Sequence, residues 1–299
     1  METVEKPPFN PYLAVLLAVM CVSTSAIFVR LSTAHPMMIA FYRMGLSALF
    51  LAPLALNRSG RKELQGMNSR DIIAAMIAGL FLAVHFTVWN ISLEYTSVAS
   101  STVLVTMQPL FVVILGYIFF KERISTKSMA GAALALTGSI LVGAADFQIG
   151  GKALLGDILA FSGAFFIAVY FLIGRQLRVK LSLFPYVFLV YGSAAVFLFI
   201  ANLLAGIPFY PYPPLDWLWF IMLTIIPTIG GHTVYNWALR YVKTIVVSVS
   251  ILGEPVGATI LAFLIFREIP GWLQLLGDLI IISGLYIFLT AARSEKQYT

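Results

Sequence analysis

Long apolar runs separated by short polar or turn-forming segments dominate the pattern along this chain. A membrane-spanning helix needs about 20 predominantly apolar residues, and ten runs of that kind follow one another. We place them near 11–30, 36–57, 70–92, 96–120, 127–145, 152–175, 183–206, 215–240, 244–266 and 271–292. Connections such as Asn57-Arg58-Ser59-Gly60 are short and leave no room for a soluble domain. The pattern therefore predicts an all-α integral membrane protein with ten transmembrane helices.

Composition narrows the class of protein further. Hydrophobic residues make up 60% of the chain and charged residues only 11%, whereas ordinary globular chains carry roughly a quarter charged residues. The net charge is +6, but the basic residues are scattered singly between apolar runs, which excludes nucleic acid as a partner. The lone cysteine, Cys21, lies in an apolar run. We therefore expect no disulfide framework, no metal site and no cofactor.

Lysines and arginines fall unevenly on the two sides of the predicted bundle. With a cytoplasmic N-terminus, fifteen of the 19 basic residues lie on the inner side and Arg43 lies within a helix. Only Arg30, Lys152 and Arg267 lie on the outer side. Because cytoplasmic loops carry an excess of basic residues, this distribution predicts that both termini are cytoplasmic. A count of nine or eleven helices would remove the bias.

An internal repeat divides the chain into halves. Residues 89–138 align with residues 235–284 at a constant offset of 146 without a gap. The matched positions include Asn90 with Asn236, Pro109 with Pro255, Lys121-Glu122 with Arg267-Glu268, Gly131 with Gly277 and Gly138 with Gly284. We therefore predict two five-helix repeats, 11–145 and 152–292, within one membrane domain. Because five is odd, the repeats are inverted, as in many secondary transporters with a midplane site.

These residues resemble the EamA-type ten-helix exporters of the drug/metabolite transporter superfamily, over roughly residues 11–292. The resemblance is carried by Ala40-Phe41-Tyr42-Arg43, residues 95–99, Gln108-Pro109, residues 120–123, Gly131, Gly138 and their counterparts in the second half. It implies a secondary-active transporter that exports small metabolites, amino-acid-like or drug-like. One departure is Gln108, where the family more often has a serine. No particular cargo is implied.

Glu254 is the strongest functional candidate. It follows the predicted start of the ninth helix by ten residues, which places it about 15 Å deep at 1.5 Å per residue. Ser250, Glu254 and Gly257 share one helix face. A charge near the bilayer centre is costly, so such a residue is a functional candidate by default. We expect Glu254 to couple protons or to pair with a cationic cargo group; the alternative is a structural glutamate beside a kink.

Other polar and aromatic residues at corresponding depths are expected to line a central cavity. His85 and Trp89 share a face of the third helix, as His232 and Asn236 do in the eighth. The remaining candidates are Asn90, Gln108, Tyr170 and Tyr235. For the histidines the alternative is a satisfied core group, and for Gln108 it is a structural bond between the fourth and ninth helices. Pro109, Pro227 and Pro255 are the expected hinge or kink positions, because proline interrupts helical hydrogen bonding.

Arg43 and Asp278 lie at similar depths below the predicted outer surface. We expect them to form a structural ion pair, with a role in binding anionic cargo as the weaker alternative.

A secondary transporter accounts for the inverted repeat and the midplane polar groups. The open alternatives are an uncoupled facilitator or exchanger of the same superfamily and, less favoured, a non-transport membrane enzyme. The chain contains neither HExxH nor GxSxG, which argues against an enzyme. We expect a multi-pass protein of the plasma or inner membrane, monomeric or homodimeric, with a small-molecule substrate and with protons as the candidate coupling ion.

Overall fold

The computed structural model describes residues 7–121, 124–146, 151–267 and 269–295. All regular elements in these ranges are helical, and ten helices are long and apolar enough to span a membrane. The ten predicted spans are therefore confirmed, with ends that differ by only a few residues. Glu122, Arg123 and Glu268, which contributed to the sequence resemblance or repeat, lie outside the described residues.

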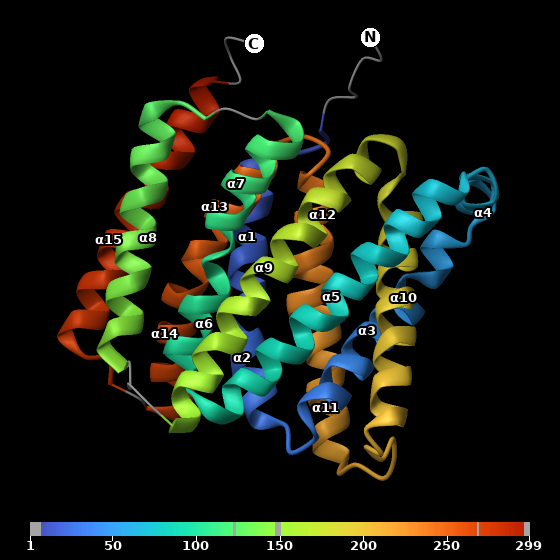
Figure 1. Ribbon diagram of the computed structural model, residues 1–299, viewed down its shortest axis with the longest axis horizontal. Helices are drawn as coiled ribbons and strands as arrows, with labels where there is room; N and C mark the ends of the chain where they lie inside the picture. The colour runs from blue at the N-terminus through green and yellow to red at the C-terminus, as the bar shows by residue number, and fades with distance from the viewer. Residues whose placement is uncertain (1–6, 122–123, 147–150, 268, 296–299) are drawn as a thin grey trace.

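The first half contains the elements α1 (Pro11–Val22), α2 (Ser25–Leu31), α3 (Pro36–Ala55), α4 (Arg58–Gln65), α5 (Ser69–Tyr95), α6 (Val98–Thr106), α7 (Gln108–Phe120) and α8 (Thr126–Asp146). The second half contains α9 (Gly151–Lys180), α10 (Leu183–Leu204), α11 (Pro214–Leu223), the π-helix η1 (Thr224–Thr233), α12 (Val234–Ala238), α13 (Thr244–Ser250), the 3₁₀ turn η2 (Ile251–Gly253), α14 (Glu254–Phe266) and α15 (Trp272–Glu295). Figure 1 shows these helices running between two ends of the molecule, with both chain termini at the same end.

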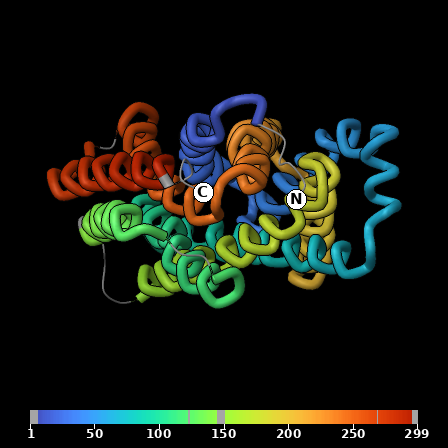
Figure 2. The backbone as a smooth tube through the Cα atoms, turned by 90° about the horizontal axis from the view of Figure 1, so that it is seen from above, coloured from blue at the N-terminus to red at the C-terminus, as the bar shows by residue number. Residues whose placement is uncertain are grey.

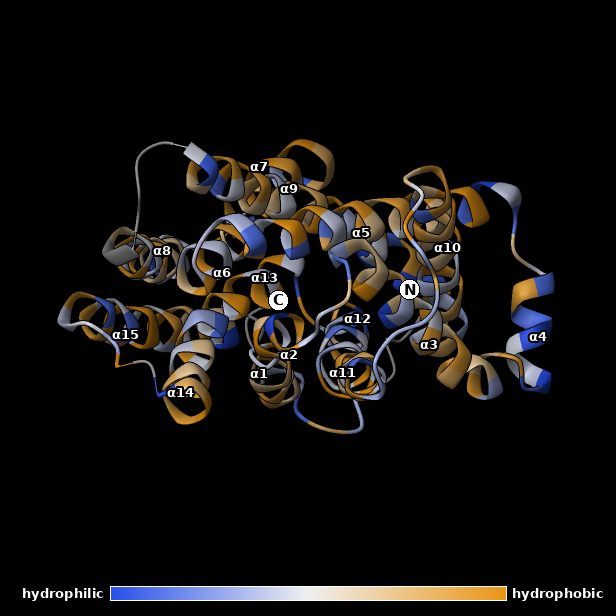
Figure 3. Ribbon diagram, turned by 90° about the horizontal axis from the view of Figure 1, so that it is seen from below, coloured by the Kyte–Doolittle hydropathy of each residue, from blue (hydrophilic) through white to orange (hydrophobic). Residues whose placement is uncertain are grey.

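Local sequence signals explain where several helices begin. Asn10 and Asn68 accept hydrogen bonds from backbone N–H groups in the first turns of α1 and α5, because a helix start leaves such donors unpaired. Ser97 caps α6 in the same way. The short helix α4 is capped by Asn57 and is a polar element at the edge of the bundle (Figure 3). The sequence pattern predicts only a short connection there.

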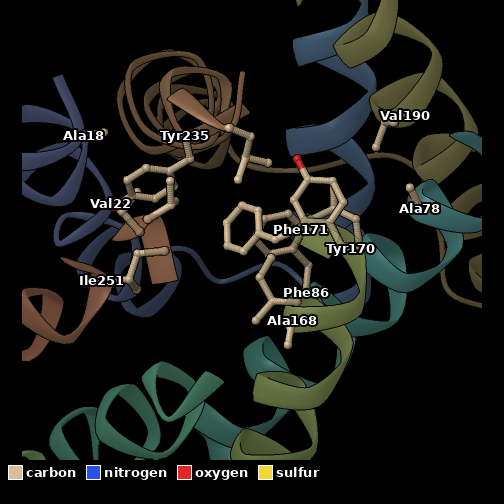
Figure 4. Close-up of a cluster of buried hydrophobic side chains, with 14 of the residues drawn as sticks. Ala18, Val22, Ala78, Phe86, Ala168, Tyr170, Phe171, Val190, Tyr235 and Ile251 are labelled. Atoms are coloured by element: carbon tan, nitrogen blue, oxygen red, sulfur yellow. The ribbon is translucent and has the colours of Figure 1, made fainter. Parts of the chain in front are cut away.

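Large apolar side chains cover the outside of the bundle. Leu49, Phe119 and Leu203 are among the exposed apolar side chains on transmembrane helices. In water such a surface would be unfavourable, whereas lipid chains solvate it. Inside the bundle, small residues bring helices close together and aromatic rings fill the space between them. Figure 4 shows part of this core, with Phe86, Phe171 and Tyr235 projecting toward one another.

Four spans are interrupted near the centre of the molecule. The first breaks between α1 and α2, the fourth at Met107 between α6 and α7, and the ninth at η2 between α13 and α14. The breaks of the fourth and ninth spans lie next to Pro109 and Pro255, which cannot donate a backbone hydrogen bond. Pro227 lies inside the π-helix of the eighth span. The predicted kink positions therefore coincide with irregular helix geometry, while their role as hinges stays a prediction.

The internal repeat is visible in the details of the backbone. Lys121 ends α7 with φ of 54° and its repeat mate Arg267 ends α14 with φ of 60°, so both residues adopt the left-handed conformation. Such a conformation is uncommon for a residue with a side chain. Its recurrence at matched positions supports the alignment of the two halves.

Matched glycines also pack α8 against α15, side by side at one edge of the bundle (Figures 1 and 2). A Cβ atom on Gly138 would lie 2.6 Å from the carbonyl oxygen of Gly277, and one on Gly277 would lie 2.8 Å from the carbonyl oxygen of Gly138. Gly131 and Gly284 show the same reciprocal contact. The two helices therefore approach so closely that their interface requires glycine, as in other membrane helix pairs.

Polar contacts fix equivalent loops at the two ends of the bundle. Asp216, in the first turn of α11, accepts hydrogen bonds from Ser32 Oγ at 2.7 Å and from the Thr33 backbone N–H at 2.8 Å. In the other half, Asp71 in the first turn of α5 forms an ion pair of 2.9 Å with Lys180. In each half a carboxylate at the start of the third span thus contacts the connection between the first two spans of the other half.

Candidate functional site

A small cavity lies between the two halves, at the level of the helix breaks. It has a volume of about 30 Å³, which is enough space for a water molecule. Its lining residues are Val22, Ser25, His85, Phe86, Trp89, Val105, Thr106, Gln108, Ile167, His232, Tyr235, Ile251 and Glu254. These come from α1, α2, α5, α6, α7, α9, η1, α12, η2 and α14, so both repeats contribute.

Six of the predicted site residues meet at this central cavity: His85, Trp89, Gln108, His232, Tyr235 and Glu254. Gln108 begins α7 and its repeat mate Glu254 begins α14. The local reason is the same in both halves. The helix breaks one residue before a Gln-Pro or Glu-Pro pair, and the first residue of the new helix projects its side chain into the cavity.

Three other candidates have different surroundings. Asn90 donates a hydrogen bond of 3.0 Å to the carbonyl of Pro36. Asn236 donates to the hydroxyl of Tyr170 and to the carbonyl of His232. None of these three side chains lines the cavity described above. All three residues are buried, and their polar groups bond within the protein.

Several polar atoms around the cavity are buried and have no partner in the described part of the chain. They are Nε1 of Trp89, Oε1 of Gln108, Nδ1 of His232 and Oη of Tyr235. Buried polar atoms in proteins are nearly always hydrogen-bonded, and leaving one unpaired costs about 1–3 kcal/mol. Their concentration around one cavity makes this cavity the candidate binding site.

His85 has a defined partner and, with it, a defined role. Its Nδ1 atom lies 3.0 Å from the carbonyl oxygen of Gly163. Because a carbonyl can only accept, Nδ1 carries the proton and Nε2 of the neutral ring is an acceptor. The ring stacks on Trp89, with centroids 6.4 Å apart and planes at 7°. His85 therefore orients one aromatic wall of the cavity.

Arg43 and Asp278 do not form the predicted ion pair. Arg43 donates from Nε to Thr228 at 2.7 Å and from Nη1 to Ser25 at 2.9 Å, and its guanidinium lies 4.0 Å from the ring centre of Phe86. Asp278 is hydrogen-bonded to Thr259 instead. The prediction was wrong because equal depth in the membrane does not imply proximity. The helices α3 and α15 stand apart in the bundle (Figure 2).

Arg43 instead supplies positive charge directly behind the cavity wall. Two of its contacts, Ser25 and Phe86, line the cavity. Its Nη2 atom is buried and has no hydrogen-bond partner among the described residues. The central site thus combines a carboxyl group, a nearby guanidinium and aromatic walls.

A larger cavity, which we call the vestibule, opens at the end of the molecule opposite the termini. Its volume is about 380 Å³. Its polar lining residues are Arg30, Thr96, Ser97, Thr102, Thr259 and Gln274. Pro255 lines the vestibule, while the adjacent Glu254 lines the central cavity. Neighbouring residues at the start of α14 therefore line the two spaces. The vestibule could not be predicted from the sequence pattern, because its lining comes from junctions between helices.

Contacts at the opposite end tie the two halves together. Phe9 stacks on Trp237 with ring centres 4.4 Å apart. Asp71 of the first half pairs with Lys180 of the second, and within the second half Arg178 donates a hydrogen bond of 3.0 Å to the carbonyl of Asn236. The central cavity thus lies between a packed end, which carries the termini, and an end that is opened by the vestibule.

Ten apolar spans, two similar halves and a polar cavity between them define a polytopic membrane protein of the transporter class. The model of the EamA-like transporter family matches residues 10–144 and again residues 154–290. The chain belongs to the EamA-like transporter family, within the drug/metabolite transporter superfamily.

Relatives along the whole chain agree with this assignment. An "Uncharacterized transporter" of Archaeoglobus fulgidus is 24% identical over 95% of this chain and 98% of its own length. A "Probable amino-acid metabolite efflux pump" of Escherichia coli is 27% identical over 74% of this chain and 75% of its own. A solved crystal structure shares the fold with a TM-score of 0.76 and 19% identity, covering 96% of this chain and 98% of the other. Family and relatives point to a transporter rather than an enzyme.

Proposed function

We propose that this protein is a secondary-active exporter of small metabolites, which it moves across the plasma or inner membrane by alternating access. The observation that carries the proposal is the group of unpartnered polar atoms around a cavity built by both repeats. Inverted repeats with a site at their interface are how many transporters expose one site to either side in turn.

The two cavities support an access cycle. With both termini in the cytoplasm, the vestibule faces outward, and the start of α14 lies between it and the central site. In this conformation the central cavity holds little more than water, at about 30 Å³. Cargo binding therefore requires the interrupted helices to move. Met107 and the turn Ile251–Gly253 are the irregular positions at which α7 and α14 can change angle.

Chemistry at the central site favours an amino-acid-like or drug-like cargo with an apolar or aromatic part. Trp89 and Tyr235 offer donors, Gln108 offers an acceptor, and Glu254 suits a cationic group or a proton. The Escherichia coli relative, named a probable amino-acid metabolite efflux pump, is consistent with this class.

Glu254 is the proposed coupling residue. Glu254 is 5% exposed, and Arg43 lies behind the wall of the same cavity. Burial favours the neutral form of a carboxyl group, so Glu254 can take up and release a proton as access changes. The repeat mate Gln108 carries an amide in the same local geometry. An ionisable group is therefore not needed to build this helix start.

The decisive experiment compares Glu254→Gln with Glu254→Asp and wild type in proteoliposomes, with a panel of amino acids, drugs and metabolites and with or without a proton gradient. We expect Glu254→Gln to lose gradient-driven accumulation and its pH dependence, while Glu254→Asp retains part of both. Thermal melting checks that each variant is folded. Normal accumulation and unchanged pH dependence in Glu254→Gln would refute coupling at this residue. Equilibration without accumulation by the wild type would instead identify a facilitator.

A further inference from the structure

Asp278 is a second carboxyl group inside a membrane-spanning segment, and the central site does not use it. It follows the start of α15 at Trp272 by six residues, so it lies about 9 Å along the helix at 1.5 Å per residue. Glu254 lies twelve residues from the corresponding end of α14 at Phe266, or about 18 Å. The side chain of Asp278 is 7% exposed. An intramembrane carboxyl at this depth is energetically costly when ionised.

A short hydrogen-bond chain joins Asp278 to the wall of the vestibule. Gln274 donates from Nε2 to the hydroxyl oxygen of Thr259 at 2.8 Å, and Thr259 is hydrogen-bonded to Asp278. Gln274 and Thr259 both line the vestibule, whereas Asp278 lies behind them. The hydroxyl of Thr259 is therefore the contact between the buried carboxyl and the water-accessible space.

One oxygen of Asp278 remains unsatisfied. Its Oδ1 atom is buried and has no hydrogen-bond partner in the described part of the chain. Among the described residues, no ion pair forms with Asp278, and Arg43 is occupied elsewhere. An ionised carboxylate with a buried, unpaired oxygen is strongly disfavoured. A proton on that oxygen removes the charge and needs no additional volume, whereas a metal ion would need space at an atom that has no accessible surface.

Few other charges face this position. Within α15 the charged side chain Arg293 lies in the last turn. From α14 come Glu254 at its start and Arg267 at its end, and Arg30 shares the vestibule lining. The packed elements α13 and η2 contain no titratable residue, and α8 has Lys127 and Asp146 only near its ends. The charge state of Asp278 is therefore governed mainly by its access to vestibule water.

We propose that Asp278 is a proton-binding residue that exchanges protons with the vestibule through the hydroxyl of Thr259. The hydroxyl gives its proton to the carboxylate and receives another from vestibule water, so the carboxyl changes from charged to neutral and the threonine is unchanged. The role of Asp278 as a sensor of outer pH, separate from proton coupling at Glu254, rests on the proposed transport function.

Neutral Asp278 favours closure of the vestibule. Closing removes water from the wall formed by α14 and α15, and only the neutral carboxyl tolerates that loss at low cost. An acidic outer solution therefore shifts the protein toward the closed vestibule. Asp278→Asn is permanently neutral and should remain shifted toward closure at every outer pH.

The primary test is infrared difference spectroscopy of the purified protein in lipid, which follows the carbonyl stretch of protonated carboxyl groups as pH is varied without any cargo. We expect Asp278→Asn to remove one titrating band and Glu254→Gln to remove a different one. In Thr259→Val, the proton affinity of Asp278 should rise by about tenfold, because a hydrogen bond to the charged form is lost. Thr290→Val, on the lipid-facing part of α15, is the matched control and should leave the titration unchanged.

The second test measures transport in proteoliposomes at varied outer pH and fixed inner pH. Asp278→Asn should weaken the response to outer pH, leaving only the part that comes from coupling at Glu254, while retaining transport at acidic pH. The inference is overturned if Asp278→Asn leaves every titrating band in place, or if sodium rather than pH alters the band. If the infrared band of Asp278 titrates but the wild-type protein transports no compound of the test panel, the inference is supported and the proposed function is refuted. If Asp278→Asn fails to fold, the shift in Thr259→Val decides the question.

Discussion

At the scale of single residues, Arg43 illustrates how a buried charge is accommodated in this fold. Its side chain has no accessible surface, and its partners are two hydroxyl groups and the face of Phe86. Arginine suits this setting because its planar guanidinium donates in several directions and packs on aromatic faces. The side chain links α3 to α2, α5 and η1, which are elements that meet at the central cavity.

Replacement of Arg43 by lysine tests this arrangement. Arg43→Lys keeps the positive charge but loses the planar guanidinium group with its several donors. The hydroxyl of Ser25 or of Thr228 therefore loses a charged hydrogen-bond partner. We expect a loss of stability of about 1–3 kcal/mol, measured as a lower melting temperature in detergent. Arg61→Lys is the control, because Arg61 makes its hydrogen bond to the carbonyl of Leu56 on the exposed helix α4. Equal melting temperatures for Arg43→Lys and wild type would contradict the structural role described for Arg43.

At the scale of elements, the contact between α8 and α15 depends on glycine at four matched positions. In Gly138→Ala the new methyl group would lie 2.6 Å from the carbonyl oxygen of Gly277. Backbone atoms cannot move aside as the end of a flexible side chain can, so the two helices must separate. We expect this to lower the free energy of unfolding by about 1–3 kcal/mol.

Gly192→Ala in α10 is the matched control, since nothing lies within 4 Å of its added methyl group. For Gly192→Ala we expect no loss of stability, and a gain of up to about 1 kcal/mol from the better helix propensity of alanine. The two variants are compared by thermal melting in the same detergent. Equal behaviour would show that α8 and α15 are not held at the distance that the structure gives.

At the scale of the whole molecule, the even number of spans places both termini at one end. The distribution of basic residues predicts that this end is cytoplasmic. Reporter fusions at the C-terminus and in the segment of α4, together with labelling of a cysteine introduced at Gly271, would test the orientation. We expect a cytoplasmic signal from both fusions and labelling of position 271 from outside. The opposite pattern would make the vestibule face the cytoplasm and reverse the proposed direction of access.

The sequence alone determined the number and extent of the membrane spans, the repeat and the protein class. Each depends on patterns that are local or periodic: a run of apolar residues needs no partner to identify it, and Pro109 and Pro255 mark helix breaks by their own chemistry. Burial of His85, Trp89, His232, Tyr235 and Glu254 around one space also followed from the matched depths of their helices.

Only the tertiary structure decided which polar groups meet. Depth along a helix is a coordinate that the sequence provides, but the angle around the helix and the order of helices in the bundle depend on packing between distant segments. For that reason Arg43 and Asp278, predicted as partners, have separate environments, and Asn90, Tyr170 and Asn236 bond to neighbouring helices outside the cavity lining. The vestibule likewise depends on packing, because its polar wall is assembled from the ends of α2, α5, α6, α14 and α15.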